Sequence, residues 1–77
     1  MKIEKYHITA RQYRQRGAIG SSMQHGLSMF VMAENHDVAL VKAYETVDDL
    51  IMPFVTCCRT NKGSYMVNNT STLMGEN

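Results

Sequence analysis

The sequence is poor in cysteine and contains no long apolar run, and each shortage excludes a class of protein. Its two cysteines are the neighbours Cys57 and Cys58, and a disulfide between adjacent residues is strained and rare. This is not the cysteine spacing of a secreted disulfide framework. The apolar stretches around 29–33 and 50–55 are too short to span a bilayer, and the charged start of the chain does not resemble a signal peptide. We expect a soluble, cytoplasmic protein in a reducing compartment, with no membrane contact.

Motifs for catalysis and for metal or cofactor binding are also lacking. The histidines and cysteines are not arranged in the closely spaced pairs that zinc sites use. The glycines of residues 17–26 are not followed by the Lys-Ser or Lys-Thr of a phosphate-binding loop. No spacing orders a nucleophile, a histidine and an acid, and a domain of 77 residues leaves little room for a deep pocket. We therefore expect no enzyme, no metal and no cofactor.

Carboxylates are nearly absent from the first part of the chain. Between Glu4 and Glu34 there is none, and three arginines fall within "ARQYRQRG", residues 10–17. Residues 1–33 carry a net charge of +4 and residues 34–52 a net charge of −4, although the whole chain has only +1. Such a layout can give a basic and an acidic face. The alternative is that the two segments neutralise each other across the folded surface.

Two stretches have the alternation or the composition of strands. Residues 2–9, "KIEKYHIT", predict a strand that continues through residues 10–14. Arg11 and Arg14 would then lie on opposite faces. A short helix over residues 9–17 is the alternative.

The middle of the chain predicts a hairpin followed by a helix. Residues 27–33 and 38–45 are apolar on both faces, and "ENHD" between them favours a tight turn. Apolar residues at helical spacing then predict a helix from Val47 to at least Met52, with Thr46 as its N-cap.

Pro53 conflicts with a longer helix, because proline inside a helix costs about 3 kcal/mol. A rival interpretation ends the helix at Met52 and places two strands after Pro53. Residues 63–69 are a plausible final strand in either case.

Together these elements predict a single α+β domain. Its order would be β-β-β-α-β: an antiparallel sheet of three to five strands with one helix on one face. Residues 17–26 would form a flexible Gly/Ser loop and residues 70–77 a frayed tail. Met29, Met32 and Met52 are expected to fill the core, although methionine also suits adaptable binding surfaces.

The basic stretch is the first candidate site. Arginine side chains match phosphate oxygens, and tyrosine rings stack on unpaired bases. Against this, the sequence pI of 7.8 is below the value above about 9 that marks most nucleic-acid binders. An edge strand also uses charge simply to avoid aggregation. The candidate residues for a nucleic acid or an acidic partner are Lys5, Arg11, Tyr13, Arg14 and Arg16.

The acidic segment is the second candidate. Glu34 and Asp37 would flank the hairpin turn, and Glu45 would precede the helix. Together they could meet a basic groove on a partner, such as one that normally holds nucleic acid. For Asp48 and Asp49, capping of the helix dipole is the stronger explanation.

No motif is specific enough to indicate a family. The preferred hypothesis is a small non-catalytic protein-binding module that inhibits or regulates a larger partner, as many small phage and mobile-element proteins do. That comparison rests on size and architecture alone. The alternative is a protein that binds RNA or single-stranded DNA through the segment Arg11 to Arg16. A third hypothesis is a homodimer that pairs through edge strands.

Overall fold

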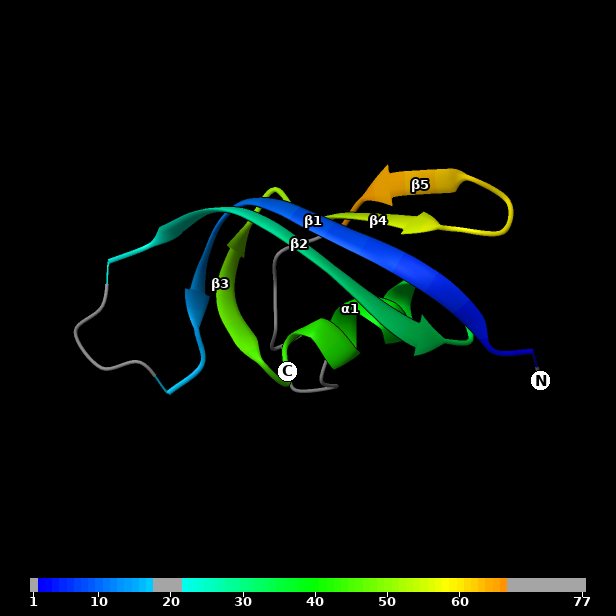
Figure 1. Ribbon diagram of the computed structural model, residues 1–77, viewed down its shortest axis with the longest axis horizontal. Helices are drawn as coiled ribbons and strands as arrows, with labels where there is room; N and C mark the ends of the chain where they lie inside the picture. Colours follow the sequence, from blue (N-terminus) through cyan, green and yellow to red (C-terminus); the bar gives the residue numbers. More distant parts are fainter. Residues whose placement is uncertain (1, 18–21, 67–77) are drawn as a thin grey trace, which may run out of the picture.

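The computed structural model describes residues 2–17 and 22–66. Within these residues it is an antiparallel sheet of five strands with one helix, which confirms the α+β class (Figure 1). The order is β-β-α-β-β-β, so the predicted β-β-β-α-β is wrong in detail. The elements are β1 (Glu4–Gln15), β2 (Gln24–Ala33), α1 (His36–Ala43), β3 (Val47–Ile51), β4 (Phe54–Cys57) and β5 (Lys62–Tyr65).

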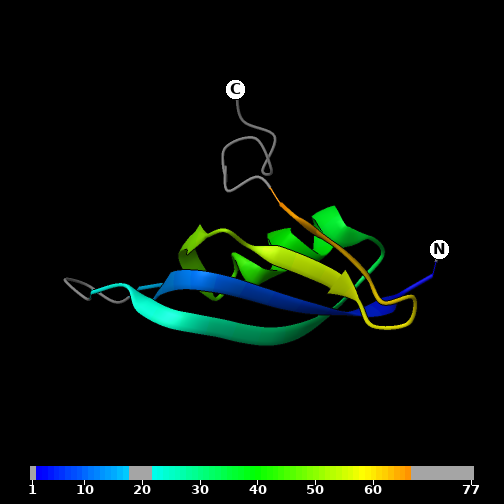
Figure 2. The same cartoon turned by 90° about the horizontal axis from the view of Figure 1, so that it is seen from above.

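The long strand β1 organises the sheet, whose order is β2-β1-β4-β5 with β3 also paired to β1 (Figure 2). One edge of β1 pairs with β2 from Glu4 to Tyr13. The other edge pairs first with β4, up to Thr9, and then with β3 from Gln12 onward. The continuous strand through "ARQYR" is therefore confirmed, and the alternative of a short helix is wrong.

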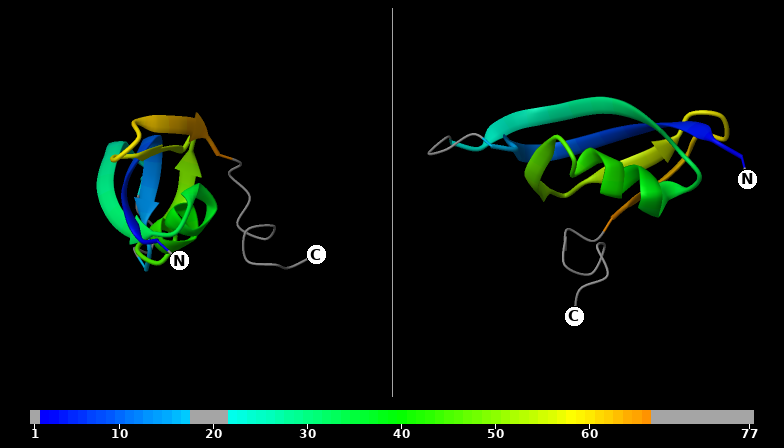
Figure 3. Two further views of the ribbon diagram at one scale, coloured as in Figure 1. Left: turned by 90° about the vertical axis from the view of Figure 1, so that its right-hand side faces the viewer. Right: turned by 90° about the horizontal axis from the view of Figure 1, so that it is seen from below.

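The core lies between one face of the sheet and α1 (Figure 3). Alternate residues of β1, namely Tyr6, Ile8 and Ala10, are buried on that face because successive side chains of a strand point to opposite sides. Leu40 of α1 and Val55 of β4 are fully buried beside them. The opposite face of the sheet is not covered by a helix or strand of the described residues.

The predicted hairpin over residues 27–45 is only half correct, because its second strand is the helix α1. The Asn35 side chain caps this helix: its Oδ1 accepts a hydrogen bond of 2.8 Å from the backbone N–H of Val38. Ala39 and Ala43, four residues apart, face the core together. The apolar β-branched residues of this segment favour a strand by propensity, and the asparagine cap with tertiary packing overrides that preference.

The predicted helix from Val47 is the strand β3. Val47 and Leu50 are both buried, which resembles the spacing of a helix. Asp49 between them has a φ of 52°, and the pairing of β1 with β3 shifts register at this point. This irregularity places two residues three apart on one side of a strand. The two strands that the rival interpretation places after Pro53 are confirmed by β4 and β5, but its short helix up to Met52 is wrong.

Three smaller expectations also need correction. The loop predicted at 17–26 ends earlier, because Gln24–Ala33 is a strand, and residues 18–21 lie outside the described residues. The predicted tail at 70–77 and the end of the strand predicted at 63–69 lie outside them as well. Met29 packs against the core, but Met32 and Met52 are each 52% exposed, so the core assignment is wrong for both.

No helix within residues 2–17 and 22–66 has the length and apolar character needed to cross a bilayer.

Candidate functional site

The basic stretch is divided by the fold. Arg14 forms an ion pair with Asp49. Arg16 forms a second one with Asp48, with its Nη2 2.8 Å from Asp48 Oδ1. The Nε of Arg16 also donates a hydrogen bond of 2.7 Å to the carbonyl of Tyr44. At this end of β1 the basic and acidic segments neutralise each other, as the alternative interpretation of the charge layout stated. Asp48 and Asp49 are therefore ion-pair partners in β3, and their predicted role as helix caps is wrong.

The other candidate residues of β1 have different surroundings. Tyr13 packs against the core, and its hydroxyl donates a hydrogen bond of 2.7 Å to Gln24 Oε1. Lys5 and Arg11 are exposed. Arg59 forms an ion pair with Glu4, with its Nε 2.7 Å from Glu4 Oε2. Within the described part of the chain, Arg11 is the one arginine that makes no hydrogen bond or ion pair.

Lys5 and Arg11 belong to the uncovered face of the sheet, which we call the open face. Strand alternation and cross-strand register define it, because residues paired across antiparallel strands share a face. His7 of β1 is paired with Phe30, and Thr9 is paired with Phe54, which in turn is paired with Tyr65. No carboxylate is among its members. They are Lys5, His7, Thr9 and Arg11 of β1; Ser28, Phe30 and Met32 of β2; Phe54 and Thr56 of β4; and Gly63 and Tyr65 of β5.

The first aromatic pair of the open face joins β1 and β2. The rings of His7 and Phe30 are stacked, with centroids 4.5 Å apart and planes 17° from parallel. A hydrogen bond of 2.8 Å joins His7 Nε2 and Ser28 Oγ and orients the imidazole. Lys5 Nζ lies 4.7 Å from the centroid of Phe30, within the range of a cation–π contact. Phe30 nevertheless remains 55% exposed, so part of its ring is available to a ligand.

The second aromatic pair joins β4 and β5. The rings of Phe54 and Tyr65 meet edge to face, with centroids 4.8 Å apart, and Tyr65 is 67% exposed. Gly63 makes room for this pair, because a Cβ at that position would lie only 2.6 Å from Cε2 of Phe54. The absence of a side chain at Gly63 lets the Phe54 ring lie across β5.

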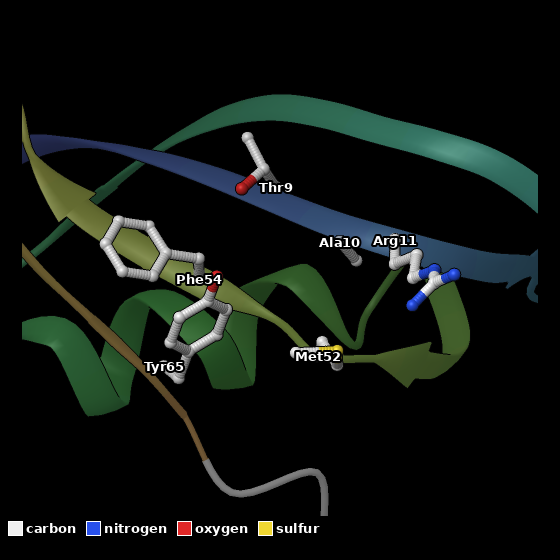
Figure 4. A pocket seen from close by; sticks show the side chains of 6 residues that line it. All are labelled: Thr9, Ala10, Arg11, Met52, Phe54 and Tyr65. Atoms are coloured by element: carbon white, nitrogen blue, oxygen red, sulfur yellow. The ribbon is translucent and has the colours of Figure 1, made fainter.

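A hollow of about 470 Å³ opens beside this second pair (Figure 4). It lies where the edge partner of β1 changes from β4 to β3, so β1 is unpaired on that side between Thr9 and Gln12. Ala10 and Met52 supply apolar wall, and the guanidinium of Arg11 supplies charge. Its lining residues are Thr9, Ala10, Arg11, Met52, Phe54 and Tyr65.

The acidic candidates do not form one surface. Glu34 precedes α1 and Asp37 lies in its first turn, whereas Glu45 follows its end. An α-helix of eight residues is about 12 Å long, so Glu45 is far from the other two. Glu34 and Asp37 do not flank a hairpin turn, and Glu45 does not precede a helix, because the helix lies between them.

Three of the titratable groups with shifted pKa values are buried, and the fourth is the exposed Arg59, whose pKa is raised by its hydrogen bond with Glu4. Burial raises the pKa of Tyr6 above its usual value, and burial likewise raises the pKa of Tyr44. A hydrogen bond from the Thr60 hydroxyl lowers the pKa of Cys57, but that thiol is only 4% exposed. Cys57 and Cys58 are both free thiols. In the described ranges, no three His, Cys, Asp or Glu side chains converge as a metal site requires.

The sequence interpretation missed the aromatic residues of the open face. Phe30, Phe54 and Tyr65 are far apart in the sequence, and only the sheet register brings them beside β1. The sequence could have indicated Phe30, because it alternates with residues of the opposite face in a predicted strand. No sequence pattern indicates the hollow, because it depends on the change of edge partner along β1.

Comparison with known proteins adds no relative: no family model, no curated protein and no solved structure matches this chain.

Proposed function

We propose that this protein is a non-catalytic binding module that holds single-stranded RNA or DNA on its open face. The observation that carries the proposal is the composition of that face: two aromatic pairs, each with one exposed ring, lie beside Lys5 and Arg11, and no carboxylate is present among its described members. Unpaired bases stack on aromatic rings, and cations between the rings attract the phosphates.

Both aromatic pairs have ring surface to offer. Tyr65 is 67% and Phe30 is 55% exposed, although apolar rings of this size are normally buried. Stacking on a base is worth about 1–3 kcal/mol per ring and is tolerant of sequence. The low net charge of +1 implies that stacking supplies more of the affinity than the phosphate contacts do.

Only two of the basic residues predicted from the sequence take part in this proposed binding. Lys5 and Arg11 would contact the strand, whereas Arg14 and Arg16 are held by the aspartates of β3. The Tyr13 ring packs against the core and its hydroxyl is bonded to Gln24, so this side chain is not available to a ligand. A cytoplasmic setting, in which Cys57 and Cys58 stay reduced, suits such a role.

A second candidate is the protein-binding inhibitor or regulator of a larger partner. The exposed apolar side chains of Met32 and Met52, each 52% exposed, favour it because methionine adapts to varied protein surfaces. Glu34, Asp37 and Glu45 are too widely spaced to act as one acidic patch, so such a partner would also use the open face. A homodimer through the exposed edge strand β5 is the third proposal.

Fluorescence anisotropy tests the first proposal. A labelled single strand of about eight nucleotides, a length typical of small single-strand binding domains, is titrated at low and at physiological salt. We expect binding that weakens with salt, with a slope of log affinity against log salt near −1 to −2 for about two phosphate contacts. Phe30→Ala with Tyr65→Ala should weaken binding by about 100-fold or more, and Tyr13→Phe is the matched control. The absence of binding at low salt would reject the proposal and favour a protein partner, whereas a concentration-dependent mass in light scattering would favour the homodimer.

A further inference from the structure

We propose that the hollow beside Phe54 and Tyr65 holds one guanine base of the bound strand, with its O6 and N7 on the guanidinium of Arg11. This inference rests on the proposed function and names the base that the open face selects. The hollow and the free arginine are two independent observations that meet at one place.

The size and walls of the hollow suit a nucleobase. Its volume of about 470 Å³ lies within the range of about 300–1,000 Å³ that small-ligand sites occupy. Ala10 and Met52 form apolar wall, and the exposed ring of Tyr65 is an aromatic surface on which a base can stack. The larger ring system of a purine covers more of that wall than a pyrimidine does.

The polar groups of the hollow select among the bases. Arg11 offers a fork of donors and no acceptor, and the side chains that line the hollow include no carboxylate. Guanine presents two adjacent acceptors, O6 and N7, which match this fork. Adenine presents N7 beside an amino donor, so one arm of the fork would meet a donor instead of an acceptor.

Arg11 is free to make this contact, in contrast to the other arginines. Arg14, Arg16 and Arg59 each lie against a carboxylate. A guanidinium that already forms an ion pair has fewer donors and less uncompensated charge to offer a base, whereas Arg11 can present its whole fork. Arg14 is therefore a matched control for Arg11 on the same strand.

Four strands of about eight nucleotides test the inference; they are identical except for G, A, C or U at one central position. We expect the wild-type protein to bind the G strand about tenfold more tightly than the A strand. Arg11→Lys keeps the charge and loses the fork, so it should remove the preference and still bind all four strands. Arg14→Ala should keep the preference. Circular dichroism of each variant confirms the fold.

Two outcomes overturn the inference and leave the proposed function standing. The first is equal wild-type affinity for all four strands. The second is an equal loss of affinity for all four in Arg11→Ala, which would assign Arg11 to a phosphate. Failure of every strand to bind the wild-type protein would reject the proposed function and the guanine site together.

Discussion

The two halves of β1 carry similar cations and have opposite surroundings. In the half from Lys5 to Arg11 the paired residues on the open face are apolar, aromatic or hydroxyl-bearing, and the cations meet no carboxylate. From Tyr13 to the end of the strand, and on to Arg16 just beyond it, β3 brings two aspartates against two arginines. The comparison shows that a basic run in a sequence is not by itself a binding surface. The strand that pairs beside it decides which cations stay available.

The change of partner along β1 produces this difference. β4, which contains no charged residue, pairs with the first half, and β3, "VDDLI", pairs with the second. The hollow lies at the boundary between the two. The change of edge partner from β4 to β3 therefore separates the unpaired cations from the neutralised ones. It also opens the hollow beside Arg11, the last unpaired cation along β1.

The largest expected loss of affinity comes from removing the exposed aromatic rings beside the first half of β1. Phe30→Ala combined with Tyr65→Ala should weaken single-strand binding by about 100-fold or more, since each stacking ring contributes about 1–3 kcal/mol. Both side chains are more than half exposed, so the free energy of unfolding should change little. Anisotropy and chemical denaturation measure the two quantities. Full affinity in a folded double variant would refute a role for the rings.

The next largest effect is a loss of stability on removing the space that Gly63 leaves for the Phe54–Tyr65 pair. Gly63→Ala places a Cβ 2.6 Å from the Phe54 ring and the same distance from Thr56 Oγ1, so the ring must move. We expect the free energy of unfolding to fall by about 1–3 kcal/mol, as overpacking usually does. Urea denaturation measures this change. An unchanged midpoint would show that Phe54 relaxes freely and that Gly63 does not position it.

A third change breaks the comparison itself, by making the second half of β1 resemble the first. Asp48→Asn with Asp49→Asn removes the carboxylate partners of Arg14 and Arg16. Asparagine tolerates the φ of 52° at position 49. Each exposed ion pair is worth only about 0.2–1 kcal/mol, so the fold should persist. Arg14 and Arg16 alternate with Arg11 along the chain, so they add net charge rather than direct contacts for a strand on the open face. Single-strand affinity at low salt should therefore rise by no more than about threefold, and the salt slope should stay nearly unchanged. A slope steeper by about 1.4 would mean that the bound strand also contacts these two arginines.

The smallest effect concerns the covered face of β1. Burial raises the pKa of Tyr6, so its neutral form is favoured in the folded state. Stability from this group is complete below the usual tyrosine pKa of about 10 and decreases as the pH rises above it, because the unfolded state loses the proton first. Alkaline denaturation should show that the part of the tyrosinate absorbance removed by Tyr6→Phe appears only as the fold is lost. Ionisation of Tyr6 in the folded protein near its usual pKa would contradict its burial.

Sequence patterns predicted the parts of this fold that local alternation controls. The strands β1 and β2 follow from alternating apolar residues, as did the α+β class. The exchange between α1 and β3 could not be predicted from periodicity. The irregularity at Asp49 gives a strand the three-residue spacing of a helix, and the cap at Asn35 makes a helix of a segment with strand composition.

The candidate site was predictable only in its charges. Lys5 and Arg11 were identified from the sequence, but so were Arg14 and Arg16, and only the position of β3 separates the two pairs. The aromatic residues depend on a register that joins distant residues, such as His7 with Phe30 and Thr9 with Phe54. Such pairings are set by tertiary packing, which one sequence does not reveal.

The most direct test of the open face is a ¹H–¹⁵N NMR titration of the protein with an unlabelled single strand of about eight nucleotides. We expect the largest shift changes on His7, Thr9 and Arg11 and on their cross-strand neighbours in β2, β4 and β5. Amides of Arg14, Arg16 and β3 should move little. Saturating binding with changes confined to α1 and β3, or no change at all, would contradict this expectation.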